Sequence, residues 1–233
     1  MAVTLDELTI ADSPRAWRDC GFEVRDDCCV LGEVKVRLDP EQEGRGIVGW
    51  ALRGVESLEL DGLPTLRADE LRQGDTPPPD PPPPDPPPDK TSSRPAPAHP
   101  NGVTSIDHVV AISPDLDRTV AALVAAGLDL RRVREEPTPA GAPRQAFFRL
   151  GGTILEVVQE PPEATERAGG DRPAFFWGLA LTAPDLDATV AFLGERAGEP
   201  RAAVQPGRRI ATLRRGAGLS LPVALMTPPP VGR

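Results

Sequence analysis

The sequence contains no tyrosine and only two lysines, two histidines and three cysteines among 233 residues. Three cysteines are an odd number and Cys28 and Cys29 are adjacent, so we expect no disulfide framework. Adjacent strand residues point to opposite faces, which favours idle thiols over a metal or redox pair. No apolar run approaches the roughly 20 residues of a membrane helix, and no secretory signal is visible. We therefore expect a cytoplasmic protein that does not span a membrane.

Basic charge is also scarce at one end of the chain. Residues 1–74 carry a net charge of −7 and residues 75–102 one of −2, whereas residues 103–233 are neutral, within a total of −9. An acidic N-terminal part repels phosphate backbones, so nucleic acid is not an expected partner.

Proline, by contrast, is abundant and concentrated. Thirteen of the 30 prolines lie between Pro77 and Pro100. Because proline fixes φ and donates no backbone hydrogen bond, this segment can join neither a helix nor a central strand. We interpret residues 75–102 as a linker in polyproline II conformation that spaces two domains, and a ligand for a proline-binding module is the alternative.

The C-terminal part contains an internal repeat. IDHVVAISPDLDRTVAAL begins at Ile106 and FWGLALTAPDLDATVAFL begins at Phe176, 70 residues later. Each copy predicts a strand, a Pro-Asp-Leu-Asp turn and a helix, with Pro114 and Pro184 in the first helical turns. Three strand-like segments follow each helix. The pattern predicts two β-α-β-β-β units, 103–160 and 173–228, whose sheets face each other and form a cup.

These paired units, with DHVVAISPDLDRTVAAL opening the first and GTILEVVQ closing it, resemble the vicinal oxygen chelate superfamily. That superfamily includes glyoxalase I, extradiol dioxygenases, methylmalonyl-CoA epimerase and bleomycin-resistance proteins. The resemblance implies an α+β fold, in which paired βαβββ modules form a cupped, partly open mixed β-barrel. It does not imply one reaction, since the fold serves many.

Residues 1–74 form a separate small α+β unit in this interpretation. DELTIADSPRAWRDCGFEV repeats the order strand, proline turn and helix, which fits a third, shortened module; an unrelated α+β domain is the alternative. A single unit would leave one sheet face uncovered. We therefore expect it to pair with the C-terminal domain or with a second chain as a homodimer.

The resemblance also implies a metal site. Superfamily enzymes hold a divalent metal with side chains from the first and last strands of each unit, typically His, Gln or Glu. His108 and Glu156 occupy these places in the first unit and would bind Fe, Mn, Ni or Zn. In the second unit, motif matching puts Gly178 opposite His108 and Pro222 opposite Glu156, and neither can ligate a metal through its side chain. The site is thus incomplete unless Glu7 or a second chain completes it.

Other positions predict ligand contacts. Without a metal, Glu156 among apolar neighbours would have a raised pKa, as a general base near neutral pH requires. Gln145, Phe147 and Arg149 alternate onto one strand face that could line the cup. Trp177 could wall an apolar pocket, although core packing is the simpler interpretation. Arg149, Arg132 and Arg209 could hold a carboxylate or phosphate, or could be ordinary exposed arginines.

Two function classes follow from this reading. The first is a metal-assisted lyase, isomerase or dioxygenase that acts on a small oxygenated metabolite, with Glu156 as its catalytic residue. The second is a non-catalytic protein that sequesters a small molecule in the cup, as bleomycin-resistance proteins do. Loss of both second-unit ligands favours the binder, whereas retention of His108 with Glu156 favours the enzyme.

Overall fold

The computed structural model describes residues 2–71, 99–137, 141 and 143–230. The predicted linker at 75–102 therefore lies almost entirely outside the described residues. Within the described ranges, no helix is long and apolar enough to cross a membrane.

The C-terminal part is built on one eight-stranded sheet with the order β7-β8-β9-β6-β10-β13-β12-β11. Its first unit comprises β6 (Ser105–Ser113), α3 (Leu116–Ala125), β7 (Asp129–Arg134), β8 (Gln145–Leu150) and β9 (Thr153–Gln159). After the short helix α4 (Pro162–Arg167), the second unit comprises β10 (Phe175–Thr182), α5 (Leu186–Leu193), β11 (Arg201–Ala202), β12 (Arg209–Thr212) and β13 (Val223–Met226). The element order confirms the predicted α+β fold of paired β-α-β-β-β modules.

The two units join through antiparallel β6 and β10. In this ladder, Gly178 lies opposite Val110 and Ala180 lies opposite His108. Gly178 is 70 residues after His108, and Ala180 is 70 residues after Val110, so each pair joins equivalent positions of the two units in exchanged order. A local twofold axis therefore relates the units. They form one continuous curved sheet, and the two halves face each other only across its concave side.

Both predicted helices form, with small changes at their ends. Asp115 and Asp185 are the N-caps, and each carboxylate accepts a hydrogen bond from a backbone N–H three residues later, at 3.0 Å. Pro114 and Pro184 precede these caps rather than occupying the first turn. Helix α5 is short because it ends at Gly194, whose φ of +56° suits glycine.

The N-terminal part forms a five-stranded sheet with the order β2-β3-β1-β4-β5. Its elements are β1 (Thr4–Ile10), α1 (Pro14–Asp19), β2 (Cys28–Leu31), β3 (Val34–Leu38), β4 (Ile47–Arg53), β5 (Thr65–Arg67) and α2 (Ala68–Leu71). Strand β1 pairs in parallel with β3, and β3 pairs antiparallel with β2. This is the order of β6, β9 and β8 with the outermost strand left out, which is the pattern expected of a shortened module.

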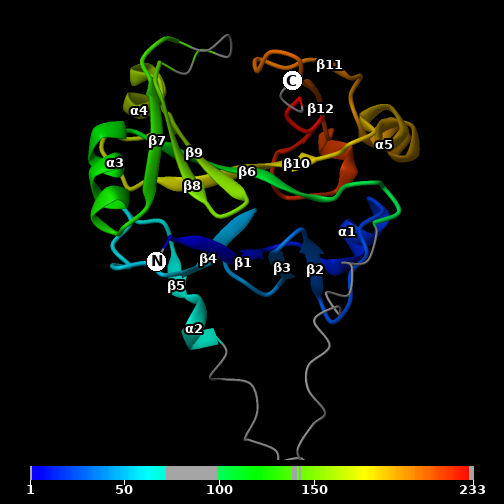
Figure 1. Cartoon of the computed structure of the whole chain (residues 1–233), viewed down its shortest axis with the longest axis horizontal. Helices are drawn as coiled ribbons and strands as arrows, with labels where there is room; N and C mark the ends of the chain where they lie inside the picture. Colours follow the sequence, from blue (N-terminus) through cyan, green and yellow to red (C-terminus); the bar gives the residue numbers. More distant parts are fainter. Residues whose placement is uncertain (1, 72–98, 138–140, 142, 231–233) are drawn as a thin grey trace, which may run out of the picture.

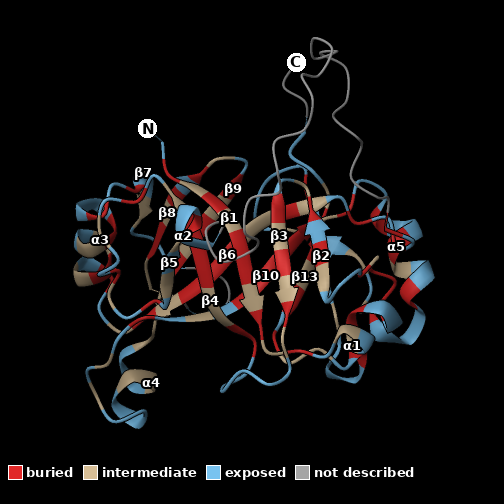
Figure 2. Cartoon of the chain, turned by 90° about the horizontal axis from the view of Figure 1, so that it is seen from below, coloured by how far each residue is buried: buried red, intermediate tan, exposed pale blue. Residues whose placement is uncertain are grey.

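The apolar face of this five-stranded sheet packs against the eight-stranded sheet, between α3 and α5 (Figure 1). Buried residues of both sheets fill one continuous core (Figure 2). At its centre, the rings of Trp50 on β4 and Phe176 on β10 meet edge to face, with centroids 4.9 Å apart. The N-terminal sheet is thus covered by its own chain, as the first of the two expected arrangements required.

The opposite face of the N-terminal sheet is polar. Glu7 on β1 lies 2.8 Å from the Arg37 guanidinium and 3.3 Å from the Lys35 ammonium, and Arg53 pairs with Asp6. Among the described residues, the exposed apolar side chains of Val30 and Leu66 lie on the two outer strands of this face, with the charged groups between them. The homodimer therefore stays a prediction, and an uncovered sheet face no longer supports it.

Candidate functional site

The concave side of the eight-stranded sheet encloses a cavity of about 1570 Å³, referred to below as the cup. Strand alternation decides which residues line it. On β6, His108, Val110 and Ile112 face the cup, whereas Val109 and Ala111 are fully buried. The same alternation on β9 puts Ile154, Glu156 and Val158 in the cup wall.

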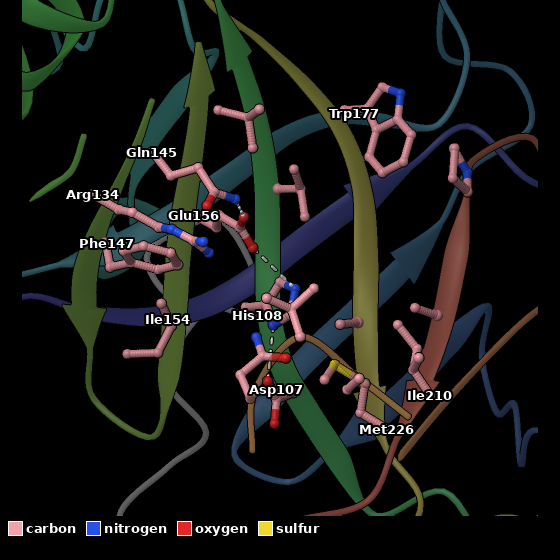
Figure 3. A pocket seen from close by; sticks show the side chains of 18 of the residues that line it. Asp107, His108, Arg134, Gln145, Phe147, Ile154, Glu156, Trp177, Ile210 and Met226 are labelled. Carbon is pink, nitrogen blue, oxygen red and sulfur yellow. Dashed lines mark hydrogen bonds and ion pairs between the residues drawn. The ribbon is translucent and has the colours of Figure 1, made fainter. Parts of the chain in front are cut away.

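His108 and Glu156 point toward each other across the paired strands β6 and β9 (Figure 3). The Nε2 atom of His108 lies 3.3 Å from Oε2 of Glu156, and 13% of each side chain is exposed. On β8, Gln145 donates a hydrogen bond from Nε2 to Oε1 of Glu156. The structure thus brings together three of the predicted site residues on three neighbouring strands.

The other ring nitrogen of His108 is held by Asp107. Its Nδ1 atom lies 2.8 Å from Oδ1 of Asp107, which is also paired with Arg208. Arg208 precedes β12, has 8% of its side chain exposed, and donates from Nε to the Thr227 carbonyl oxygen at 2.7 Å. The result is a connected row of four side chains, Glu156, His108, Asp107 and Arg208. Sequence reasoning missed the last two because neither occupies a ligand position of the resembled family.

The two carboxylates in this row have opposite electrostatic environments. Burial raises the pKa of Glu156 above its ordinary value of 4.5, against the opposing effects of His108 and Gln145. Burial would also raise the pKa of Asp107, but hydrogen bonds from His108 and Arg208 outweigh it and lower that pKa. Asp107 is therefore an ionised acceptor, so the proton on Nδ1 of His108 points to it. The Nε2 atom faces Oε2 of Glu156.

The remaining predicted site residues divide between the cup and the surface. Phe147 and Trp177 line the cup, and Trp177 keeps 48% of its surface exposed. Arg132 also lines it, with its guanidinium carbon 5.1 Å from the centroid of the Phe147 ring. Arg149 is exposed and does not line the cup. Arg209 pairs instead with Asp187 on α5, at 2.6 Å.

The strand register corrects one expectation about the second unit. Val110 lies opposite Glu156 in the β6–β9 ladder, and its repeat partner Ala180 lies opposite Ala224 in the β10–β13 ladder. Ala224, not Pro222, therefore takes the place of Glu156. The motif match failed because the β12–β13 connection, Leu213–Pro222, is much longer than the Gly151–Gly152 turn between β8 and β9. Gly178 does occupy the place of His108.

The donor set does not fit a divalent metal. His108 and Glu156 supply two ligands, and glycine and alanine occupy the other two places. Among the residues that the structure describes, no group of three His, Cys, Asp or Glu side chains could hold a metal ion. Catalytic metal sites commonly use three protein ligands. Glu7 cannot complete the set, because it lies on the far face of the N-terminal sheet with Lys35 and Arg37.

A comparison with protein-family models matches residues 105–217 to the Glyoxalase/Bleomycin resistance protein/Dioxygenase superfamily. The matched segment begins at β6 and ends just before β13, so it spans both units of the cup. Residues 105–217 of this chain belong to that superfamily. A search of curated proteins found no significant match.

Solved structures with similar folds include methylmalonyl-CoA epimerase from Mycobacterium tuberculosis, at 20% identity and a TM-score of 0.45, covering 55% of this chain and 91% of that one. A hypothetical protein from Bacillus halodurans C-125 matches at 14% identity and a TM-score of 0.45, covering 55% and 97%. A variant of the Streptomyces coelicolor epimerase in complex with 2-nitronate-propionyl-CoA matches at 23% identity and a TM-score of 0.44, covering 56% and 99%.

Proposed function

We propose that the superfamily domain binds a small oxygenated metabolite in the cup and needs no metal ion to do so. The observation that carries the proposal is the cluster of Glu156, His108 and Gln145 in the wall of a largely apolar cavity, with Gly178 and Ala224 where the other metal ligands would stand. A few converging polar groups in a concave apolar site are the usual features of a small-molecule site.

The polar cluster has capacity left for a ligand. The Glu156 carboxyl accepts from Gln145 through one oxygen and faces the His108 ring with the other. A carboxylate offers about four lone-pair sites, so a hydroxyl or protonated group of a ligand can still donate to it. A ligand that carries oxygen atoms can therefore form hydrogen bonds with this polar cluster, while the apolar residues of the cup wall can contact its carbon skeleton.

Trp177 makes this proposal testable by fluorescence. Trp17 and Trp50 are almost fully buried, at 0% and 2% exposure, whereas Trp177 lines the cup, and the chain has no tyrosine. A panel of small hydroxy, keto and carboxylic acids and alcohols should contain compounds that change the Trp177 emission equally with and without EDTA. Trp177→Phe should remove the signal.

A variant with a larger side chain inside the cup tests whether the ligand binds there. Ala224→Phe should weaken binding by about tenfold or more, because Ala224 lines the cup and the new ring occupies space inside it. Ala188→Phe, on the exposed side of α5, should leave it unchanged. The proposal fails if no compound binds, if EDTA abolishes binding, or if Ala224→Phe has no effect.

A second candidate function is a metal-independent isomerase or lyase that moves a proton. It is favoured by the raised pKa of Glu156 and by the contact of this carboxyl with Nε2 of His108. In such a reaction the ionised Glu156 takes a proton from the carbon next to a ligand carbonyl, and the electron pair moves onto the carbonyl oxygen as an enolate. The proton then returns to the ligand, either to a carbon or to a departing group, directly from Glu156 or through His108. Dioxygenase chemistry is not supported, because it requires a redox metal that the donor set does not fit.

Hydrogen exchange into a bound ligand distinguishes an enzyme from a binder. A bound keto compound in D₂O should lose its α-proton signal in the NMR spectrum when the wild-type protein is present. Glu156→Gln should slow this exchange by about 10²-fold or more while leaving the dissociation constant within a few-fold. Binding without exchange in the wild-type protein would leave the sequestration function alone.

A further inference from the structure

Most charged and amide side chains on the strands of the cup come from the first unit, although its strands also contribute apolar groups and β11 of the second unit contributes Arg201. Strands β7, β8 and β9 of the first unit contribute the charged and amide groups Arg132, Arg134, Gln145 and Glu156. Strands β10, β12 and β13 of the second unit contribute a mainly apolar surface, made of Trp177, Leu179, Ala180, Ile210, Val223, Ala224 and Met226 with Thr212 as its polar member. Figure 3 shows Arg134 and Gln145 on one side and Trp177, Ile210 and Met226 on the other.

Arg134 is a weakly held cation on the polar side, and its charge also acts on the neighbouring Glu156. It lies opposite Gln145 in the β7–β8 ladder, and 24% of its side chain is exposed. Its ion pair with Glu136 is long, at 3.7 Å between Nε and Oε2, and the Glu136 side chain is 85% exposed. Such a pair contributes little, since water screens it.

The neighbouring arginines are engaged more fully. Arg208 is bound to Asp107 and to the Thr227 carbonyl oxygen. Arg144, just before β8, is bound to both carboxylate oxygens of Glu135, at 2.7 and 3.0 Å, and to Asp117 at 3.0 Å. Arg134 therefore has a planar donor fork in the cup wall that a ligand carboxylate can occupy bidentately.

The surroundings of Arg134 favour an anion over a cation. Arg132 lies above the Phe147 ring on the same face of β7 and adds a second positive charge to this wall. Glu156 lies beside them, and Glu135 and Glu136 also line the cup; Arg144 holds Glu135, and the Glu136 side chain is 85% exposed. Gln145 further holds Glu156 by donating to it. An incoming carboxylate can thus reach two guanidinium groups in this wall.

We infer that the ligand of the cup is an amphipathic carboxylate, whose head group binds Arg134 and whose apolar body lies against Trp177, Ile210 and Met226. The inference rests on the proposed function and specifies its ligand class. A neutral metabolite would leave Arg134 without a strong partner, and a cation would be repelled by Arg132 and Arg134.

Three ligands with one carbon chain and different head groups test this inference. Octanoate, 1-octanol and octylamine are titrated separately against the full chain, and the Trp177 emission is followed. Octanoate should bind about tenfold or more tightly than 1-octanol, because hydrogen bonds to charged groups add this much affinity. Octylamine should bind most weakly.

Matched variants assign the effect to one guanidinium. Arg134→Gln should weaken octanoate binding by about tenfold and leave 1-octanol within about twofold. Arg131→Gln, the same change on the solvent side of the same strand, should alter neither. Circular dichroism of each variant verifies that it is folded.

The inference is overturned if 1-octanol binds as tightly as octanoate, if Arg134→Gln leaves octanoate binding unchanged, or if none of the three ligands changes the Trp177 signal. These outcomes are separable from failure of the proposed function. That function stands if another member of the metabolite panel binds in a manner sensitive to Ala224→Phe.

Discussion

His108 has a carboxyl group at each ring nitrogen, Asp107 at Nδ1 and Glu156 at Nε2. The two acids differ because Arg208 neutralises Asp107, whereas Glu156 faces a mainly apolar cavity. One acid therefore stays charged and orients the ring, and the other tends to keep its proton. This division of roles needs no metal. It arises because the buried Arg208 pairs with Asp107 and not with Glu156.

The stability of the protein should depend on the protonation of Glu156. Its pKa is higher in the folded protein than its ordinary value of 4.5, so the folded state binds the proton more tightly than the unfolded state does. The corresponding stability is present below that ordinary value and is lost as pH rises through the folded pKa. Glu156→Gln should flatten this part of the pH profile of the unfolding free energy, measured by urea titration. Glu136→Gln, on an exposed side chain, should reproduce the wild-type profile; equal profiles for all three proteins would contradict the prediction.

Asp107 should act in the opposite direction. Its pKa is lowered, so its stabilising effect is present above its ordinary value of 3.8 and is lost as pH falls through the folded pKa. Asp107→Asn leaves the buried Arg208 without its carboxylate, which should cost about 3–5 kcal/mol of unfolding free energy at neutral pH. Asp187→Asn removes the exposed partner of Arg209 and should cost much less, because water screens this pair. Urea unfolding at pH 7 gives both values, and similar losses would refute the buried role of Asp107.

At the scale of elements, the sequence predicted the features that recur in both units and missed those that differ between the units. The 70-residue repeat gave both units, their helices and the inward direction of His108 and Glu156, because alternation and capping are local properties. The Ala224 position was missed because an unequal connection shifts the register by two residues. Arg208 was missed because it lies in the turn before β12, and a turn residue has no periodic signal to show which side chain it will meet.

His99 shows how a segment between elements can be fixed by one neutral ring. It is buried, accepts a hydrogen bond at Nδ1 from the Glu23 N–H at 3.0 Å, and donates from Nε2 to the Val30 carbonyl oxygen at 3.0 Å. The Sγ atom of Cys29 lies 4.0 Å from Nε2, and burial raises the pKa of this thiol to about 12, which keeps it an unreactive neutral group. His99 thus attaches the chain ahead of β6 to the N-terminal sheet.

Acid should weaken this attachment. Burial lowers the pKa of His99 despite the Val30 hydrogen bond, so the stability that depends on the neutral ring is lost as pH falls from the ordinary value of 6.5 toward the folded pKa. His99→Gln should be less stable than wild type at pH 7.5 by about 1–3 kcal/mol, and the difference should shrink at lower pH. Urea titrations at a series of pH values measure it. A difference that grows with acidity would contradict this account of His99.

At the scale of the whole molecule, two sheets share one core. Trp50, Leu8 and Val36 of the N-terminal sheet are almost fully buried together with Phe148 and Val157 of the other sheet. The sequence showed that each strand has an apolar face, but not which surface would cover it, because that is decided by contacts far apart in the chain. Asp12 adds a polar link, since its carboxylate accepts from Trp17 Nε1 at 3.1 Å and from the Ser220 N–H at 3.0 Å.

The shared core predicts that cutting the chain between the two sheets will not separate them. A specific protease site placed within residues 76–89 allows cleavage into two fragments, which should elute together in gel filtration and unfold in one transition, because separating them would expose the apolar surface of both sheets. This expectation differs from the sequence-based interpretation of two domains held apart by the linker at 75–102. Trp50→Ala should lower the unfolding free energy of the uncut chain by about 3–5 kcal/mol and promote separation after cleavage. Leu66→Ala, at an exposed side chain on β5, should change neither result. Elution of a folded C-terminal fragment alone from the cleaved wild-type protein would show that the two sheets are independent domains.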